Sequence, residues 1–229
     1  MQIVFGKAYK AQGTSSPGFR TGLDLLDHLP PGGEFRCGAI HELLCGTEGS
    51  APKSFALLLA RAAQIAAGGM IVWSDPAREL YPPALSILGI DPARLILLRP
   101  GNAAEEIRLL AECLRCRGVG ATVASPRKLS RVEARRLQLA AERGGGVGLF
   151  LRPPACRGAD HYAAATRWIV RPVPGDDEAQ RWSVELVHGH GGRVGCGVLL
   201  EVDRETGVMR ASAALADRSA ATPPARATA

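Results

Sequence analysis

The chain has 229 residues, of which 46% are apolar and 22% charged, and its formal net charge is +6. These values exclude wholesale disorder and a fibrous repeat, and the length predicts one or two globular domains. The longest apolar stretch, residues 55–73, contains Arg61 and Gln64, whereas a membrane span needs about 20 uninterrupted apolar residues. Residues 1–13 lack the apolar stretch of a secretory signal, so we expect a cytoplasmic protein.

Short apolar runs alternate with helical patterns through the first two thirds of the chain. The runs are almost wholly apolar, which is typical of strands buried on both faces in a parallel sheet covered by helices. Pro82 and Pro83 are predicted to interrupt the weakest helical pattern near its start. Strands are predicted at 39–44, 70–73, 95–98, 121–124 and 147–151, and helices at 54–67, 77–88, 102–116 and 130–144.

Two of these helices carry clear signals at their ends. Asn102 with Glu105, and Ser130 with Glu133, have the spacing of an N-cap residue and its partner in the first turn. Gly144 is predicted to close the second of them.

The pattern changes after Pro153. Apolar and polar residues alternate over 167–171, 181–187 and 198–202, which predicts antiparallel strands with one face in solvent. From Met209 the chain consists mainly of small and polar residues and is predicted to be disordered. We therefore expect an N-terminal arm at 1–17, one core domain at 18–203 and a disordered tail at 204–229.

The segment after the strand at 39–44 occupies the place of a phosphate loop in nucleotide-binding α/β proteins. Such a loop places its lysine six positions after the first glycine, whereas Lys53 lies seven positions after Gly46. Pro52 stands where a glycine is required, and proline has no N–H and a fixed φ. We therefore expect weak anion binding at Lys53 and Ser54 and no resident cofactor, with ATP and Mg²⁺ as the alternative.

Acidic residues and cysteines give no sign of catalysis or metal binding. A carboxylate that holds Mg²⁺ is expected after the strand at 121–124, where the chain continues instead with Ser125. Asp75, which precedes a proline, is interpreted as a turn residue. The six cysteines are interpreted as small, mostly buried hydrophobic residues, with a metal or redox role for Cys113 and Cys116 as the alternative. We therefore predict no catalytic residue and no metal site.

Basic residues concentrate between Arg115 and Arg143. This segment holds eight basic and two acidic residues, and its excess of six positive charges equals that of the whole chain. A local basic surface is typical of a protein that binds a polyanion, and a solvated helix face is the alternative.

The order of several short runs is more specific than any of them alone. Thr21-Gly-Leu-Asp24, Gly38-Ala-Ile-His-Glu42 and the stretch 88–98 resemble the RecA core. The runs at 80–85, 135–142, 166–168 and 181–186 resemble the ImuA family, the RecA-like accessory proteins of bacterial damage-induced mutagenesis. The resemblance covers about residues 18–203. It implies a RecA-like P-loop NTPase core, a mainly parallel sheet flanked by helices with antiparallel strands at its C-terminal end.

The resemblance also implies a function and partners. Members of the family are expected to work with ImuB, an error-prone DNA polymerase III alpha-type subunit and RecA during translesion DNA synthesis. Tyr81 matches an adenine-stacking tyrosine and would join Gly46, Lys53 and Ser54 in a degenerate nucleotide site. Weak binding of single-stranded DNA is expected on the loops after the strands at 121–124 and 147–151. The residues concerned are Arg127, Lys128, Arg131, Arg135, Arg152 and Arg157.

The sequence therefore favours a non-catalytic scaffold. Two alternatives stay open: a DNA-dependent ATPase of RecA type with an atypical phosphate loop, and a cell-division inhibitor of the SulA type.

Overall fold

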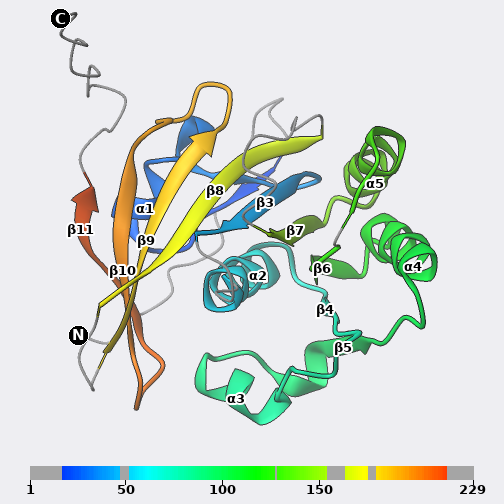
Figure 1. The fold of residues 1–229 in the computed structure, drawn as a ribbon, viewed down its shortest axis with the longest axis horizontal. Helices are drawn as coiled ribbons and strands as arrows, with labels where there is room; N and C mark the ends of the chain where they lie inside the picture. The colour runs from blue at the N-terminus through cyan, green and yellow to red at the C-terminus, as the bar shows by residue number, and fades with distance from the viewer. Residues whose placement is uncertain (1–16, 47–51, 127, 154–162, 175–178, 216–229) are drawn as a thin grey trace, which may run out of the picture.

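One sheet of nine strands organises the computed structural model, which describes residues 17–46, 52–126, 128–153, 163–174 and 179–215. In spatial order the strands run β11-β10-β9-β8-β3-β7-β6-β4-β5 (Figure 1). Their bounds are β3 (Ile40–Cys45), β4 (Met70–Ser74), β5 (Leu95–Leu98), β6 (Val119–Ala124), β7 (Val147–Arg152), β8 (Ala164–Val173), β9 (Ala179–His188), β10 (Gly197–Asp203) and β11 (Met209–Leu215).

The sheet changes character at β8. From β8 to β5 neighbouring strands are parallel, whereas β8, β9, β10 and β11 pair antiparallel. The central strand β3 has parallel partners on both sides, β7 and β8. The predicted α/β class, with a mainly parallel sheet and antiparallel strands toward the C-terminal end, is confirmed.

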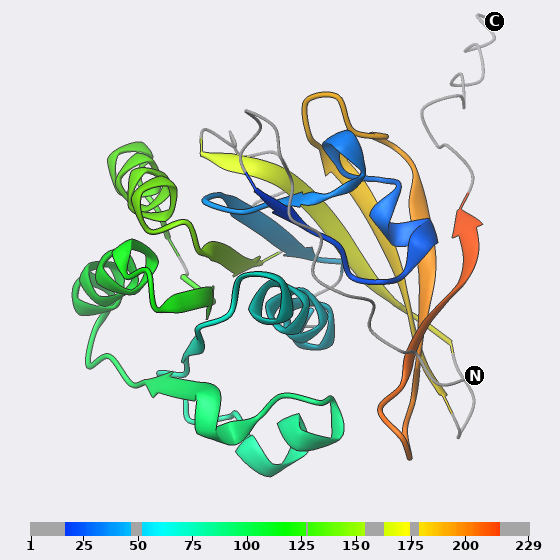
Figure 2. The ribbon, with the colours of Figure 1, turned by 180° about the vertical axis from the view of Figure 1, so that it is seen from behind.

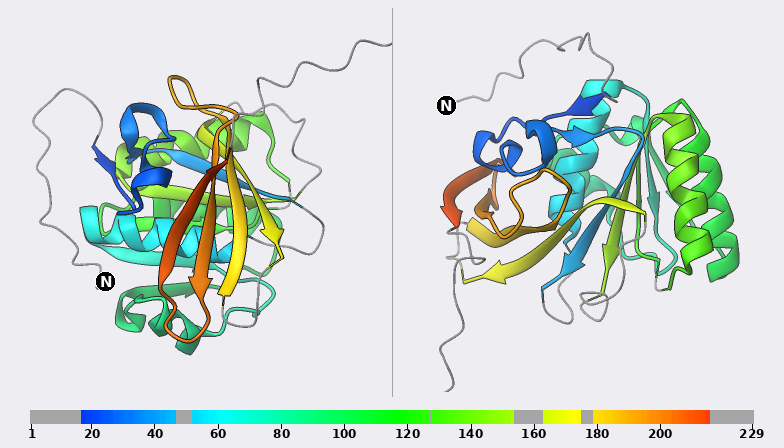
Figure 3. Two further views of the ribbon diagram at one scale, coloured as in Figure 1. Left: turned by 90° about the vertical axis from the view of Figure 1, so that its left-hand side faces the viewer. Right: turned by 90° about the horizontal axis from the view of Figure 1, so that it is seen from above.

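Helices cover both faces of the parallel half. The helices are α1 (Asp24–Asp27), α2 (Lys53–Ala67), α3 (Pro82–Ile87), α4 (Ala103–Arg115) and α5 (Arg131–Gly144), with short 3₁₀ turns η1 (Pro31–Gly33) and η2 (Pro92–Arg94). Figure 3 shows α4 and α5 on one face and α2 on the other. Alternate residues of β7 divide between the two cores: Leu149 packs with the α2 side and Phe150 with α4 and α5. None of the described helices is long and apolar enough to cross a membrane.

The N-terminal segment packs over the antiparallel half of the sheet. β1 (Gly18–Phe19) and β2 (Phe35–Arg36) form a small antiparallel pair, and α1 contacts β10 and β11 (Figure 2). The Phe35 ring stacks between Phe19 and Trp168, with centroid distances of 5.4 and 5.3 Å. This aromatic stack attaches the segment before β3 to β8.

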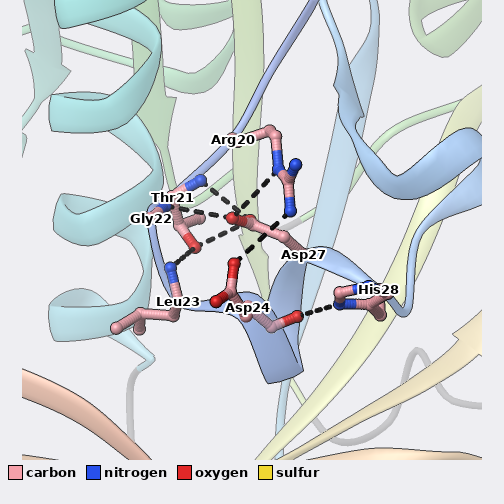
Figure 4. Close-up of polar contacts among 7 residues, drawn as sticks. All are labelled: Arg20, Thr21, Gly22, Leu23, Asp24, Asp27 and His28. Atoms are coloured by element: carbon pink, nitrogen blue, oxygen red, sulfur yellow. Dashed lines mark hydrogen bonds and ion pairs between the residues drawn. The ribbon is translucent and has the colours of Figure 1, made fainter. Parts of the chain in front are cut away.

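A buried carboxylate shapes the turn before α1 (Figure 4). Asp27 Oδ1 accepts hydrogen bonds from the backbone N–H and hydroxyl of Thr21, both at 2.8 Å, and Oδ2 accepts from Gly22 N at 3.0 Å. Arg20 Nε lies 3.6 Å from the same carboxylate. Gly22 has φ +83°, a left-handed conformation that glycine adopts without strain. The run around Thr21 is therefore a structural turn held by Asp27.

A chain of hydrogen bonds also connects β3 to β8 inside the core. Trp168 Nε1 donates to Thr166 Oγ1 at 2.7 Å, and Thr166 Oγ1 lies 2.6 Å from His41 Nδ1, which accepts from the hydroxyl because the proton of the neutral ring is on Nε2. His41 Nε2 then carries the proton donated to the Arg36 carbonyl at 3.0 Å. Burial lowers the pKa of His41 to about 4. The imidazole is therefore neutral and satisfied at both nitrogens.

Most of the predicted elements are confirmed, and two expectations are wrong. Pro82 and Pro83 do not interrupt a helix but begin α3, because the missing N–H of a proline costs nothing in the first turn. Residues 209–215, expected in a disordered tail, form β11 and pair with β10. Backbone hydrogen bonds to β10 hold β11 at the edge of the sheet, so the strand does not need large side chains. Met209 and Ala211 still pack against the core. Residues 1–16 and 216–229 lie outside the described residues.

Candidate functional site

Gly46 directly follows β3, the strand that leads into the predicted phosphate loop. Its N–H donates to the Val170 carbonyl of β8 at 2.6 Å. A Cβ at this position would lie 2.8 Å from Arg171 Cα, which is closer than Cβ atoms come to such neighbours in real proteins. The close passage of β3 along β8 is therefore sufficient reason for glycine here. The rest of the loop, residues 47–51, lies outside the described residues.

Lys53, the predicted phosphate-binding lysine, is the first residue of α2. Its Nζ lies 2.9 Å from Glu79 Oε2, and both side chains are exposed. Pro52 is the N-cap of α2 and supplies no side-chain hydrogen bond, while Ser54 is half-buried in the first turn. The N-terminus of α2 and Lys53 lie where an anion would bind, but the Lys53 ammonium already forms an ion pair with the Glu79 carboxylate.

The loop after β4 carries both that carboxylate and Tyr81. The buried Asp75 side chain accepts hydrogen bonds from Glu79 N at 2.9 Å and Leu80 N at 3.3 Å. The interpretation of Asp75 as a turn residue is confirmed, and the turn positions Glu79 beside Lys53. Tyr81 is the N-cap of α3 and its side chain is 69% exposed.

Arg152, predicted to bind DNA after β7, is instead buried, and that prediction is wrong. Its Nε lies 3.6 Å from Glu42 Oε1, and its Nη1 donates to the Pro126 carbonyl. Arg167 Nε contacts the other Glu42 oxygen at 2.6 Å. Glu42 on β3 thus holds one arginine from each neighbouring strand, and all three residues are nearly inaccessible to solvent. Burial with a carboxylate partner makes Arg152 part of the sheet interior.

The basic residues around the start of α5 are exposed. Ser130 caps α5, and Glu133 Oε2 accepts from the Ser130 N–H at 2.8 Å, so the predicted capping box is confirmed. Hydrogen bonds from Ser130 lower the pKa of the Glu133 carboxyl. Lys128 lies in the loop before the helix, and Arg131 and Arg135 lie one turn apart on it. Arg127 and Arg157, also predicted to bind DNA, lie outside the described residues.

A surface groove runs along α5 next to the C-terminal end of α4. The two helices pack side by side (Figure 1), and the groove has a volume of about 490 Å³. We call it the arginine groove, and we refer to its three apolar lining residues as the floor and to its five arginines as the walls. The lining residues are Arg115, Arg131, Val132, Arg135, Arg136, Leu139, Ala140 and Arg143.

Comparison with known proteins provides the family. The chain is 36% identical over 205 residues to the protein named Protein ImuA from two strains of Caulobacter vibrioides. The match covers 81% of this chain and 84% of that protein. The chain belongs to the ImuA family. No family model matches it.

Of the five cysteines that the structure describes in this ImuA-family chain, only Cys37 is buried, so the expectation of mostly buried cysteines is wrong. Two of the five have raised thiol pKa values. Burial, followed by the charge of Glu34, raises the pKa of Cys37 to about 11. Burial also raises the pKa of Cys113, with smaller effects from Cys116 and Glu112. Both thiols are therefore protonated at neutral pH. Within the described ranges, no three His, Cys, Asp or Glu side chains gather as they would around a metal ion.

Sequence reasoning missed two features of this ImuA-family protein. The Glu42 cluster was missed although its residues interrupt apolar strands, which is a signal for a buried ion pair. The arginine groove was missed because counting charges gives no shape. Arg136 and Arg143 were counted in the basic segment, but only the packing of α5 beside α4 brings them together with Arg115 and an apolar floor.

Proposed function

We propose that this chain is a non-catalytic accessory protein of damage-induced mutagenesis that works with ImuB and an error-prone DNA polymerase III alpha-type subunit at the nucleoid. The observation that carries the proposal is the 36% identity to Protein ImuA over 81% of the chain. The match covers 81% of this chain and 84% of that protein, so most of the fold is taken as common to both proteins.

The absence of catalysis is part of the proposal, and three contacts support it. Gly46 is explained by its close approach to β8, Lys53 is paired with Glu79, and both oxygens of Asp75 accept backbone hydrogen bonds. Proline at position 52 adds a fixed φ where a phosphate loop needs glycine. These residues have structural partners that do not require a nucleotide.

We also propose a RecA-like core and weak contacts with RecA and single-stranded DNA. A central parallel strand followed by a loop and helix, β3 to α2, is compatible with that core. Exposed Lys128 and Arg131 are suited to phosphate contacts at the start of α5, together with Arg127 and Arg135.

The proposal is tested by deleting the gene and measuring mutation frequency after ultraviolet irradiation. The deletion is expected to abolish induced mutation, the full chain to restore it, and the tagged chain to co-purify with ImuB. Normal induced mutagenesis in the deletion strain would contradict the proposal. Co-purification with a tubulin-like division protein in place of ImuB would favour the SulA-type alternative.

A further inference from the structure

We propose that the arginine groove is a docking site for an acidic segment of a partner protein that carries apolar side chains on one face. The groove follows one side of α5, where residues 132, 135, 136, 139 and 143 recur at helical spacing. Arg115 closes it from the end of α4. Figure 3 shows α4 and α5 side by side on the outer surface, with no other element over them.

The floor of the groove is apolar. Val132 is 79% exposed, the largest exposed fraction among the large apolar side chains of the described residues. Leu139 is half-buried and lies two turns further along the same face of α5, and Ala140 is buried in the α4–α5 core. A valine so exposed buries little apolar surface within the chain itself. Covering it with apolar side chains from a partner would remove that surface from water.

Three of the five wall arginines carry positive charge that no described carboxylate pairs with. Arg135, Arg136 and Arg143 have no ion-pair partner within the described ranges. The nearby carboxylates already have other partners. Glu133 accepts from Ser130, Glu142 accepts from Gln138 at 3.0 Å, and Glu112 binds Arg115 at 2.7 Å. The charge therefore favours an acidic partner.

The combination of floor and walls distinguishes a protein segment from nucleic acid. Phosphates would use the arginines but would leave Val132 and Leu139 in water. Single-stranded DNA also gains affinity by stacking bases on aromatic rings, and none of the described residues that line the groove is aromatic. An amphipathic segment matches both parts, because its apolar residues lie on the floor while its carboxylates reach the arginines in bidentate geometry.

This inference deepens the proposed accessory function and rests on it for biological meaning, but the binding itself can be tested separately. The purified full chain is titrated against a fluorescein-labelled acidic peptide of about four helical turns with leucines on one face. A peptide with serine in place of leucine and an oligo-dT of equal charge are compared with it. We expect the leucine peptide to bind at least about ten-fold more tightly than either.

Substitutions then locate the site. Arg136→Glu with Arg143→Glu, and separately Val132→Asp, are each expected to weaken the leucine peptide by about ten-fold or more. Arg193→Glu with Arg204→Glu, an equal charge change at two exposed arginines in the loops on either side of β10, is the matched control for the double variant and is expected to change affinity less than about two-fold. Circular dichroism checks that each variant is folded.

Three results would overturn the inference: no binding of the leucine peptide, equal binding of the serine peptide, or tighter binding of oligo-dT. In each case the accessory function would still be judged by the mutagenesis experiment. If the deletion strain loses induced mutagenesis but the purified chain does not bind the leucine peptide, the docking proposal is rejected and the proposed function stands.

Discussion

Two sets of arginines in this molecule have opposite surroundings. Arg152 and Arg167 lie inside the sheet on either side of Glu42, and solvent hardly reaches them. Arg135, Arg136 and Arg143 lie on the outside of α5, exposed and without a carboxylate partner among the described residues. The comparison shows that what an arginine does depends on what surrounds it more than on its place after a particular strand. The buried pair serves the fold, and the exposed set is available for a partner.

The largest expected effect is loss of the carboxylate charge at Glu42. Glu42→Gln leaves two buried guanidinium groups without an anion, so the free energy of unfolding should fall by about 3–5 kcal/mol. Urea unfolding followed by circular dichroism measures this change. The matched exposed change, Arg136→Gln, should alter it by less than about 0.5 kcal/mol. Equal effects of the two substitutions would remove the distinction between the two sets.

The next largest effect on the free energy of unfolding is expected from His41. This residue is buried and neutral, whereas Glu42 and its two arginines form buried ion pairs. Burial lowers the pKa of His41 to about 4, so between pH 6.5 and 4 the unfolded chain binds a proton that the folded chain does not. The free energy of unfolding should therefore fall as the pH drops through this window, by at most about 3 kcal/mol from this group.

Urea unfolding across that pH range checks the sign. His41→Gln removes the titrating group, so the stability profile of the variant should be flatter than that of the original chain. Parallel profiles for the two proteins would show that His41 does not contribute the pH dependence.

Substitutions at the start of α5 are expected to change stability little but to change the binding of single-stranded DNA clearly. If Arg127, Lys128, Arg131 and Arg135 contact four phosphates, the affinity for single-stranded DNA should fall with a salt slope of about −2.8. Arg127→Glu with Arg131→Glu should flatten that slope and change the free energy of unfolding by less than about 0.5 kcal/mol. Fluorescence anisotropy across a salt series measures it. An unchanged slope would assign these residues to a solvated face or to protein docking.

The smallest effect is expected at the predicted phosphate loop. Lys53→Ala removes an exposed ion pair with Glu79 worth at most about 1 kcal/mol, and Pro52→Gly does not restore the missing spacing. Neither change should alter damage-induced mutagenesis. If folded Lys53→Ala protein fails to support mutagenesis, phosphate binding is required and the non-catalytic proposal is wrong. A nucleotide titration of the original chain would then test the ATPase alternative.

The sequence was sufficient for elements with local causes. Ser130 and Glu133 specify the start of α5, and an all-apolar run such as 95–98 specifies a strand. It was insufficient where distant segments decide. β11 exists because β10 offers a free edge to a stretch of small residues. Arg152 is buried because Glu42, distant in sequence, lies beside it.

The pairing of β3 has a consequence for how this protein is made. β3 is the first strand of the large sheet to leave the ribosome, yet among the described strands it pairs with neither β4 nor β5, and its partners are β7 and β8. Its hydrogen-bonding edges, and the charge of Glu42 between them, stay without native partners until most of the chain has been synthesised. Such long-range parallel pairing slows folding and prolongs exposure of an apolar strand. Expression at reduced temperature or with a chaperone should therefore raise the yield of folded protein more than it raises total synthesis.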